Sequence, residues 1–241
     1  MGEIIKDTTT GDWVIISPAR SKRPNGLHPR CAAKSELPEH DSNCPFCEGN
    51  ESKTPQETMA YRKSGAPNSG GWDLRIFPNL FPVLEGKHEV IVESPNHSVP
   101  FFLQGSEKTE NVLKAYVERF SELAKDPRNK TICIFRNQGK NAGASLIHPH
   151  SQIISAPVES MEIAKRRRAA AEFLAKNGKC PMCAIVEDSK SSGLSIYENR
   201  QFAAFCPPAS KYPYETWIVP TVHQSSIMEV GPESMAIFIA R

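Results

Sequence analysis

Residues 137–152 read NQGKNAGASLIHPHSQ and form the most informative stretch of the chain. A glycine-containing turn leads into His148, His150 and Gln152. If residues 146–154 are extended, the alternation of a strand puts these three side chains on one face. An isolated His-x-His pair is a weak signal, but here an amide and a glycine turn accompany it. The combination favours covalent phosphoryl chemistry, in which an imidazole attacks phosphorus while neighbouring donors hold its oxygens.

The segments around this stretch alternate between short strands and longer helices. Apolar residues at helical spacing predict amphipathic helices over 107–124 and 161–176. Short apolar runs predict strands at 11–16, 88–93, 131–135 and 151–155. The 20 prolines indicate many loops between these elements. The pattern predicts an α+β fold.

Composition excludes several classes of function. The chain has 241 residues and a net charge of 29 − 27 = +2, so it offers no strong basic field for nucleic acid. It has no apolar window of transmembrane length, and its first ten residues lack the layout of a signal peptide. We therefore expect a cytoplasmic protein that binds neither nucleic acid nor membrane. Seven cysteines are too few for a disulfide scaffold, and in a reducing compartment the four that stand in Cys-x-x-Cys pairs indicate metal binding.

Two motifs recur in the same order. Cys44-Pro-Phe-Cys47 returns as Cys180-Pro-Met-Cys183, and residues 88–97 return in outline as 214–223, each time ending on a histidine. Two matches in one order indicate an internal duplication. We expect an N-terminal catalytic unit over residues 1–160 and a partial C-terminal unit over 161–241.

Each Cys-x-x-Cys pair can present two thiolates to one tetrahedral ion. In the first half, Cys44 and Cys47 have His97 and His148 as candidate partners, a donor set that suits zinc. A thioredoxin-like redox pair is the alternative, but Cys44 does not follow a strand and open a helix as that motif requires. In the second half Cys180, Cys183 and His223 repeat the set, and the fourth ligand stays open.

The chain as a whole resembles the galactose-1-phosphate uridylyltransferase family of the histidine-triad superfamily. The motifs that carry the resemblance are residues 12–24, 44–47, 94–97 and 148–152. It implies histidine-triad-like duplicated units with antiparallel sheets and flanking helices. It also implies that His150 is the nucleophile of a ping-pong reaction through a nucleotidyl-histidine.

The resemblance assigns roles to further residues. Zinc would be held by Cys44, Cys47, His97 and His148. Gln152 and Ser145, with the turn at Gly143, would hold phosphoryl oxygens. Asn79 and Asn137 would lie along the nucleotide. Arg20 and Arg23 would approach phosphates, across the interface of a homodimer.

The resemblance leaves the substrate open. The family implies transfer of a uridylyl group between UDP-hexose and hexose 1-phosphate. The Asn79-Leu80 pair and Ser151 instead resemble a branch with ADP-glucose phosphorylase activity, which transfers adenylyl groups to inorganic phosphate. A zinc-stabilised histidine-triad module that binds nucleotides without transferring them is the non-enzymatic alternative.

Spacing also predicts where the second unit ends. His148 follows His97 by 51 residues, so the matching position after His223 lies near 223 + 51 = 274, beyond Arg241. Residues 231–241 read as the start of an amphipathic helix. We therefore expect a truncated second unit that lacks a fourth metal ligand and most of the sugar contacts.

Overall fold

The computed structural model describes residues 3–16 and 37–231. The contacts divide these residues into two compact units, one made of residues 37–158 and the other of residues 3–16 with 159–230. Each unit is described by itself. The N-terminal strands group with the later part of the chain. The duplicated domains 1–160 and 161–241 stay a prediction.

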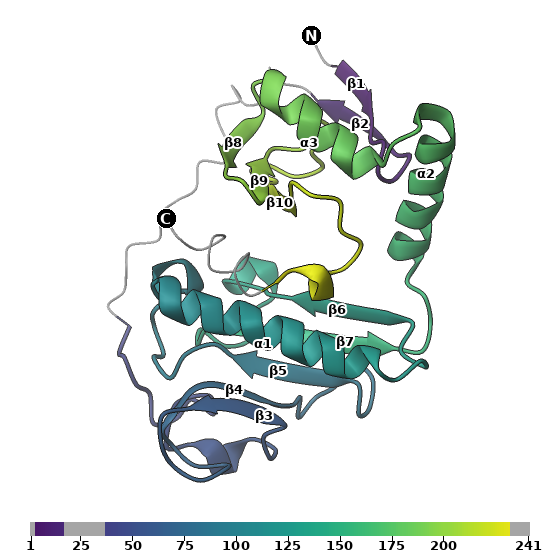
Figure 1. Ribbon diagram of the computed structural model, residues 1–241. Helices are drawn as coiled ribbons and strands as arrows, with labels where there is room; N and C mark the ends of the chain where they lie inside the picture. The colour runs from purple at the N-terminus through teal and green to yellow at the C-terminus, as the bar shows by residue number, and fades with distance from the viewer. Residues whose placement is uncertain (1–2, 17–36, 232–241) are drawn as a thin grey trace. The chain divides into compact units, whose positions relative to one another are not determined.

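The first unit is built on one antiparallel five-stranded sheet (Figure 1). Its strands are β3 (Met59–Arg62), β4 (Trp72–Pro78), β5 (His88–Val92), β6 (Thr131–Phe135) and β7 (His150–Ala156), in the spatial order β3-β4-β5-β7-β6. Helix α1 (Ser106–Ala124) packs on one face. Short 3-10 turns are η2 (Glu51–Lys53), η3 (Phe101–Leu103) and η4 (Lys140–Ala142). The antiparallel sheet and its helix match the expected α+β class.

The face of the sheet under α1 forms the larger core of this unit. Val112 and Ala115 of the helix are fully buried against Ile91 and Ile153 of the central strands. The opposite face carries a second cluster, in which Phe46 packs against buried aromatic and aliphatic side chains. The sheet therefore has two apolar faces. Helix α1 covers one of them, and the face that carries Phe46 is the one not covered by this helix.

Strand β7 decides which side chains reach that second face. Its burial alternates residue by residue, with Ser151 and Ile153 buried toward α1. His150 pairs with Val92 and Gln152 pairs with Val90, both members of the second cluster. The predicted common face of His150 and Gln152 is confirmed. The strand begins at His150 rather than at residue 146, so His148 lies just before it.

The second unit combines a hairpin, a small sheet and two helices. Strands β1 (Glu3–Lys6) and β2 (Trp13–Ile16) form the hairpin, and β8 (Ser195–Glu198), β9 (Phe202–Phe205) and β10 (Trp217–Pro220) form an antiparallel sheet in the order β10-β9-β8. The helices are α2 (Met161–Asn177) and α3 (Pro181–Ser191), and η5 (Ile227–Glu229) is a single 3-10 turn. Its core joins Ile185 and Val186 of α3 to Phe205 of β9.

Local sequence explains the helix boundaries. Ser160 caps α2 by accepting a hydrogen bond from the amide of Ile163, and Gly178 ends the helix at φ +71°. Pro181 occupies the first turn of α3, where its missing N–H costs nothing. Among the residues that the structure describes, no helix is long and apolar enough to cross a bilayer.

The two matched segments of the expected repeat differ in local structure. His88 begins β5, whereas Tyr214, at the matching position, adopts φ +63° and β10 begins at Trp217. The Glu215 carboxylate accepts hydrogen bonds from the amides of Lys211 and Tyr212 and so closes a turn at this point. His223 still follows its strand, as His97 follows β5, but β10 starts three residues after Tyr214.

Candidate active site and metal centre

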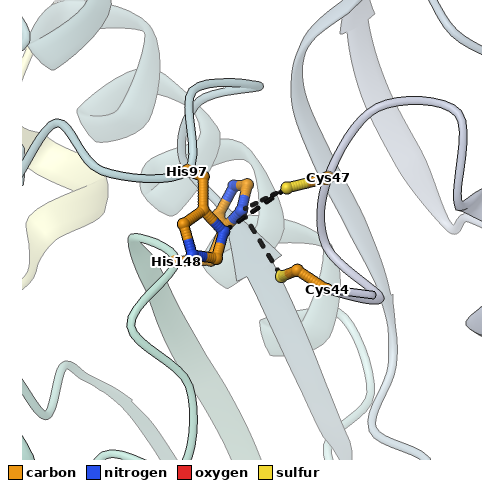
Figure 2. A group of neighbouring side chains, drawn as sticks. All are labelled: Cys44, Cys47, His97 and His148. Carbon is orange, nitrogen blue, oxygen red and sulfur yellow. Dashed lines mark hydrogen bonds between the residues drawn. The ribbon is translucent and has the colours of Figure 1, made fainter. Parts of the chain in front are cut away.

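Four predicted ligands come together in the first unit (Figure 2). Cys44 and Cys47 lie on the turn before η2, His97 follows β5, and His148 precedes β7. All four are buried, and their ligand atoms lie within 4.8 Å of one another. The Nδ1 atom of His148 lies 3.8 Å from Cys44 Sγ and 3.6 Å from Cys47 Sγ, and His97 Nδ1 lies 3.4 Å from Cys47 Sγ.

These distances fit a tetrahedral ion. Zinc–sulfur bonds of about 2.3 Å and zinc–nitrogen bonds of about 2.05 Å place sulfur and nitrogen ligands about 3.6 Å apart. His148 Nε2 donates to the carbonyl of Ser94 at 2.8 Å, which leaves Nδ1 unprotonated toward the thiols. Burial lowers the pKa of His148 to about 4, so the ring is neutral. Burial, together with the neighbouring Cys47, raises the pKa of Cys44 to about 11. A bound cation would stabilise the buried Cys44 thiolate. The four side chains could therefore hold a metal.

The turn that carries the two cysteines is fixed by its own backbone. The Cys47 amide donates to the Cys44 carbonyl at 3.2 Å, and the side-chain amide of Asn50 donates to the same carbonyl at 2.8 Å. His97 is held by its amide, which donates to the carbonyl of Glu39 at 2.8 Å. These hydrogen bonds fix the backbone that carries Cys44, Cys47 and His97.

His150 lies next to this centre and is held in one tautomer. Its Nδ1 donates to the carbonyl of His148 at 2.8 Å, so Nε2 carries the lone pair. No hydrogen bond to Nε2 exists among the described residues. Burial lowers the pKa of His150, which keeps the ring neutral. The Phe46 ring meets the His150 ring edge-on, with centroids 5.3 Å apart. These contacts fix the His150 ring and leave the lone pair of Nε2 without a hydrogen bond among the described residues.

Gln152 is bound through its carbonyl end. His88 Nε2 lies 2.8 Å from Gln152 Oε1, and Asn79 Nδ2 lies 3.5 Å from the same oxygen. Asn79, expected along the nucleotide, thus contacts Gln152 directly. His88 was not among the candidates from sequence, because it entered only as the start of a repeat. Its approach to Gln152 depends on the register of β5 and β7, which places His88 opposite Ile154, and no local sequence signal shows that register.

A buried polar network lies on the other face of β7. The Glu93 carboxylate accepts hydrogen bonds from Ser151, Arg136 and Tyr116, the last at 3.2 Å. Burial raises the pKa of Glu93, although the charge of Arg136 opposes the shift. Ser151 faces α1 and the network, so it lies on the opposite face from His150 and Gln152. Sequence reasoning did not identify this network.

The other described residues that were predicted to bind substrate in the first half do not contact His150 or Gln152 through hydrogen bonds. Asn137 is half-buried just after β6, while Gly143, at φ +80°, and Ser145 are exposed on the connection to β7. No hydrogen bond within the described part of the chain joins them to His150 or Gln152. Arg20 and Arg23 lie outside the described residues.

The second predicted metal cluster brings three ligands together. Cys180 and Cys183 flank the start of α3, and His223 follows β10. Cys183 Sγ lies 3.3 Å from His223 Nδ1. His223 is exposed and the cysteines are partly exposed, so this cluster is more open than the first. No fourth His, Cys, Asp or Glu joins it among the residues that the structure describes.

Comparison with known proteins gives consistent matches. Residues 80–160 match the family model described as galactose-1-phosphate uridyl transferase, N-terminal domain. ADP-glucose phosphorylase of Arabidopsis thaliana is 33% identical over 92% of this chain and 67% of its own length. Galactose-1-phosphate uridylyltransferase of Thermotoga maritima is 29% identical over 99% of this chain and 72% of its own. The chain thus spans about two thirds of the length of these relatives.

A solved structure agrees with the sequence matches. The crystal structure of the Arabidopsis thaliana ADP-glucose phosphorylase with bound ADP-glucose superposes with a TM-score of 0.81 at 31% identity. The match covers 98% of this chain and 73% of that one. The α+β fold with antiparallel sheets and flanking helices is confirmed.

Proposed function

Because the chain belongs to the galactose-1-phosphate uridylyltransferase family, we propose that it transfers a nucleoside monophosphate from a nucleotide sugar through a covalent intermediate on His150. The observation that carries the proposal is the arrangement of the His150 ring. Nδ1–H is bound to a backbone carbonyl, Nε2 has no partner among the described residues, and the ring is neutral. A nucleophilic imidazole needs these three conditions.

The proposed reaction has two steps. His150 Nε2 attacks the α-phosphorus of the nucleotide sugar, a P–N bond forms, and the bond from phosphorus to the bridging oxygen breaks. The sugar 1-phosphate leaves with that oxygen and its electron pair. In the second step a phosphate oxygen of the acceptor attacks the same phosphorus and the P–N bond breaks. Donors near the strand, Gln152 first, stabilise the charge on the non-bridging oxygens.

The metal cluster supports this chemistry from outside the reacting atoms. We propose that Cys44, Cys47, His97 and His148 hold zinc, which supplies folding energy rather than a reactive centre. The carbonyl of His148 accepts the Nδ1–H of His150, so a fixed His148 also fixes the nucleophile. This link explains why ligand and nucleophile stand two residues apart.

The donor favoured by the comparisons is ADP-glucose, with inorganic phosphate as acceptor. The support is the 33% identity to an ADP-glucose phosphorylase and the TM-score of 0.81 to that enzyme with bound ADP-glucose. A second candidate is the transfer of uridylyl groups from UDP-hexose to a hexose 1-phosphate. It is supported by the 29% identity to a uridylyltransferase over 99% of this chain.

A burst experiment tests the proposed reaction. The purified protein is mixed with each of ADP-glucose, UDP-glucose and UDP-galactose without acceptor, and released sugar 1-phosphate is measured at short times. The proposal predicts a burst approaching one equivalent per site with one donor, and turnover only after phosphate or a hexose 1-phosphate is added. If every donor binds and none gives a burst, the protein is a nucleotide-binding module and the proposal is wrong.

Three further properties are proposed on the same basis. The second cluster of Cys180, Cys183 and His223 binds a second zinc ion. Arg20 and Arg23 approach substrate phosphates from across a homodimer interface. Asn137, Gly143 and Ser145 contact the bound nucleotide.

A further inference from the structure

The connection between β4 and β5 contains two backbone donors whose side-chain acceptors both lead to Gln152. The amide of Val83 donates to His88 Nδ1 at 3.2 Å, and the amide of Phe81 donates to Asn79 Oδ1 at 2.9 Å. A backbone N–H can only donate. His88 Nδ1 and Asn79 Oδ1 must therefore both act as hydrogen-bond acceptors.

These backbone bonds set the proton positions further along. Because His88 Nδ1 accepts, the ring proton lies on Nε2, which is 2.8 Å from Gln152 Oε1. Because Asn79 Oδ1 accepts, its amide nitrogen is the end that faces Gln152 Oε1, at 3.5 Å. Asn79 Nδ2 and His88 Nε2 lie 3.2 Å apart, and both carry protons. They are therefore not bonded to each other, and both donate toward Gln152 Oε1.

The carbonyl end of Gln152 is thus occupied and its amide orientation is determined. Its NH2 end has no hydrogen-bond partner within the described part of the chain. Gln152 shares the strand face of His150, two residues away. A fixed NH2 donor beside a nucleophilic nitrogen is suited to a phosphoryl oxygen, whereas the carbonyl end would repel it.

We infer that His88 is a positioning residue, which fixes the amide of Gln152 with its NH2 group available to the phosphoryl oxygens of the substrate. The inference rests on the proposed function for the identity of the ligand. The tautomer of His88 and the orientation of the Gln152 amide follow from the hydrogen bonds alone, whatever the function. His88 is buried and touches Gln152 rather than the reacting atoms.

Two substitutions at one position separate this role from a purely structural one. In His88→Gln, the side-chain nitrogen takes the place of Nε2 and keeps a donor for Gln152, while the acceptor for Val83 is lost. In His88→Asn, the side-chain oxygen takes the place of Nδ1 and keeps the acceptor for Val83, while the donor for Gln152 is lost. Both variants are compared in thermal stability, metal content and rate of the first half-reaction at saturating donor.

We expect His88→Asn to slow formation of the covalent nucleotide at least about 10-fold and His88→Gln to restore most of the rate, since loss of one preorganised donor costs about 100-fold or more. Equal losses in both variants, or a larger loss in His88→Gln, would overturn the inference. A rate loss that tracks thermal stability in both variants would also overturn it.

A readout without turnover separates this inference from the proposed function. Nitrogen-15 NMR of the free protein should show His88 protonated at Nε2 and not at Nδ1. The side-chain NH2 signal of Gln152, assigned from its absence in Gln152→Glu, should shift in His88→Asn and return toward its native position in His88→Gln. A proton on Nδ1 of His88 overturns the inference. A native protein that passes both NMR tests but forms no covalent nucleotide refutes the proposed function alone.

Discussion

His150 shows how single hydrogen bonds decide the chemistry of a residue. The bond from Nδ1 to the carbonyl of His148 is short, at 2.8 Å, and leaves the outer nitrogen free. The two roles of the histidines, His148 as metal ligand and His150 as nucleophile, were implied by the family resemblance and stay a proposal. The tautomer was not predictable, because it depends on a carbonyl direction that only the folded chain fixes.

The position of His88 against Gln152 could not be predicted from the sequence. It depends on the direction of one amide in the loop before β5 and on the register between β5 and β7. Both are set by tertiary structure, and neither leaves a local signature. The cysteine and histidine ligands were predictable because a tetrahedral ion requires a particular set of donors, whatever fold presents them.

Asp7 provides a pH-dependent test at the residue scale. Burial raises the pKa of its carboxyl, but hydrogen bonds from Thr9 and Thr10 outweigh burial, and the net shift is downward. A folded pKa below the unfolded value of about 3.9 means that the stabilisation is complete above that pH and is lost as pH falls through the folded pKa.

We expect Asp7→Asn to lower the free energy of unfolding by about 1.5 to 3 kcal/mol at pH 7, as is usual for hydrogen bonds to a charged group. The difference from the native protein should shrink as the pH falls below about 4. Urea unfolding of both proteins at pH 7 and pH 3 measures it. A difference that stays constant between the two values would show that the charge of Asp7 is not responsible.

At the scale of elements, β7 joins two environments. Its odd-numbered residues face α1 and the buried Glu93 network, while its even-numbered residues face the candidate site. The strand and α1 were predicted almost to the residue because their apolar periodicity is clear. Strand β4 was not predicted, since it is buried on both faces and Arg75 and Pro78 interrupt its apolar run.

The cysteine turn also connects the candidate metal ligands to His150. Phe46 stands between the two cysteines and meets both the His150 ring and the Phe77 ring, with centroids 5.3 Å and 5.6 Å apart. Removing the ring takes away the side chain that contacts the His150 ring edge-on. The four ligands keep their backbone support.

We expect Phe46→Ala to slow the first half-reaction by about 10-fold to 100-fold, the size of effect that small misplacements of reacting groups produce. Zinc content should stay at the native level. Phe46→Leu, which keeps most of the volume, is the matched control and should retain more of the rate. An unchanged rate in Phe46→Ala would show that the ring does not position His150.

At the scale of the whole molecule, two clusters of unequal design occur in one chain. The first has four buried ligands, and the second has three partly or fully exposed ligands among the described residues. The two clusters were predicted from recurring motifs, whose origin in a duplication stays a prediction. The difference in burial between the clusters was not predicted, because it arises from packing around each motif.

A chelator titration should therefore remove metal in two phases. We expect the ion at Cys180, Cys183 and His223 to leave first and the ion at Cys44, Cys47, His97 and His148 to leave later, together with a fall in thermal stability. Cys180→Ser should abolish only the early phase and Cys44→Ser only the late one. Release in a single phase from the native protein would contradict the difference between the clusters.

The central claim is that His150 forms the covalent bond to the nucleotide, and intact-mass analysis tests it most directly. The protein is incubated with ADP-glucose or UDP-glucose without acceptor, quenched, weighed and mapped by peptides. The account predicts a mass gain of one nucleoside monophosphate less water, located on His150, which disappears in His150→Asn while that variant keeps its zinc. A native protein that gains no mass with either donor, or an adduct that persists in His150→Asn, would contradict the account.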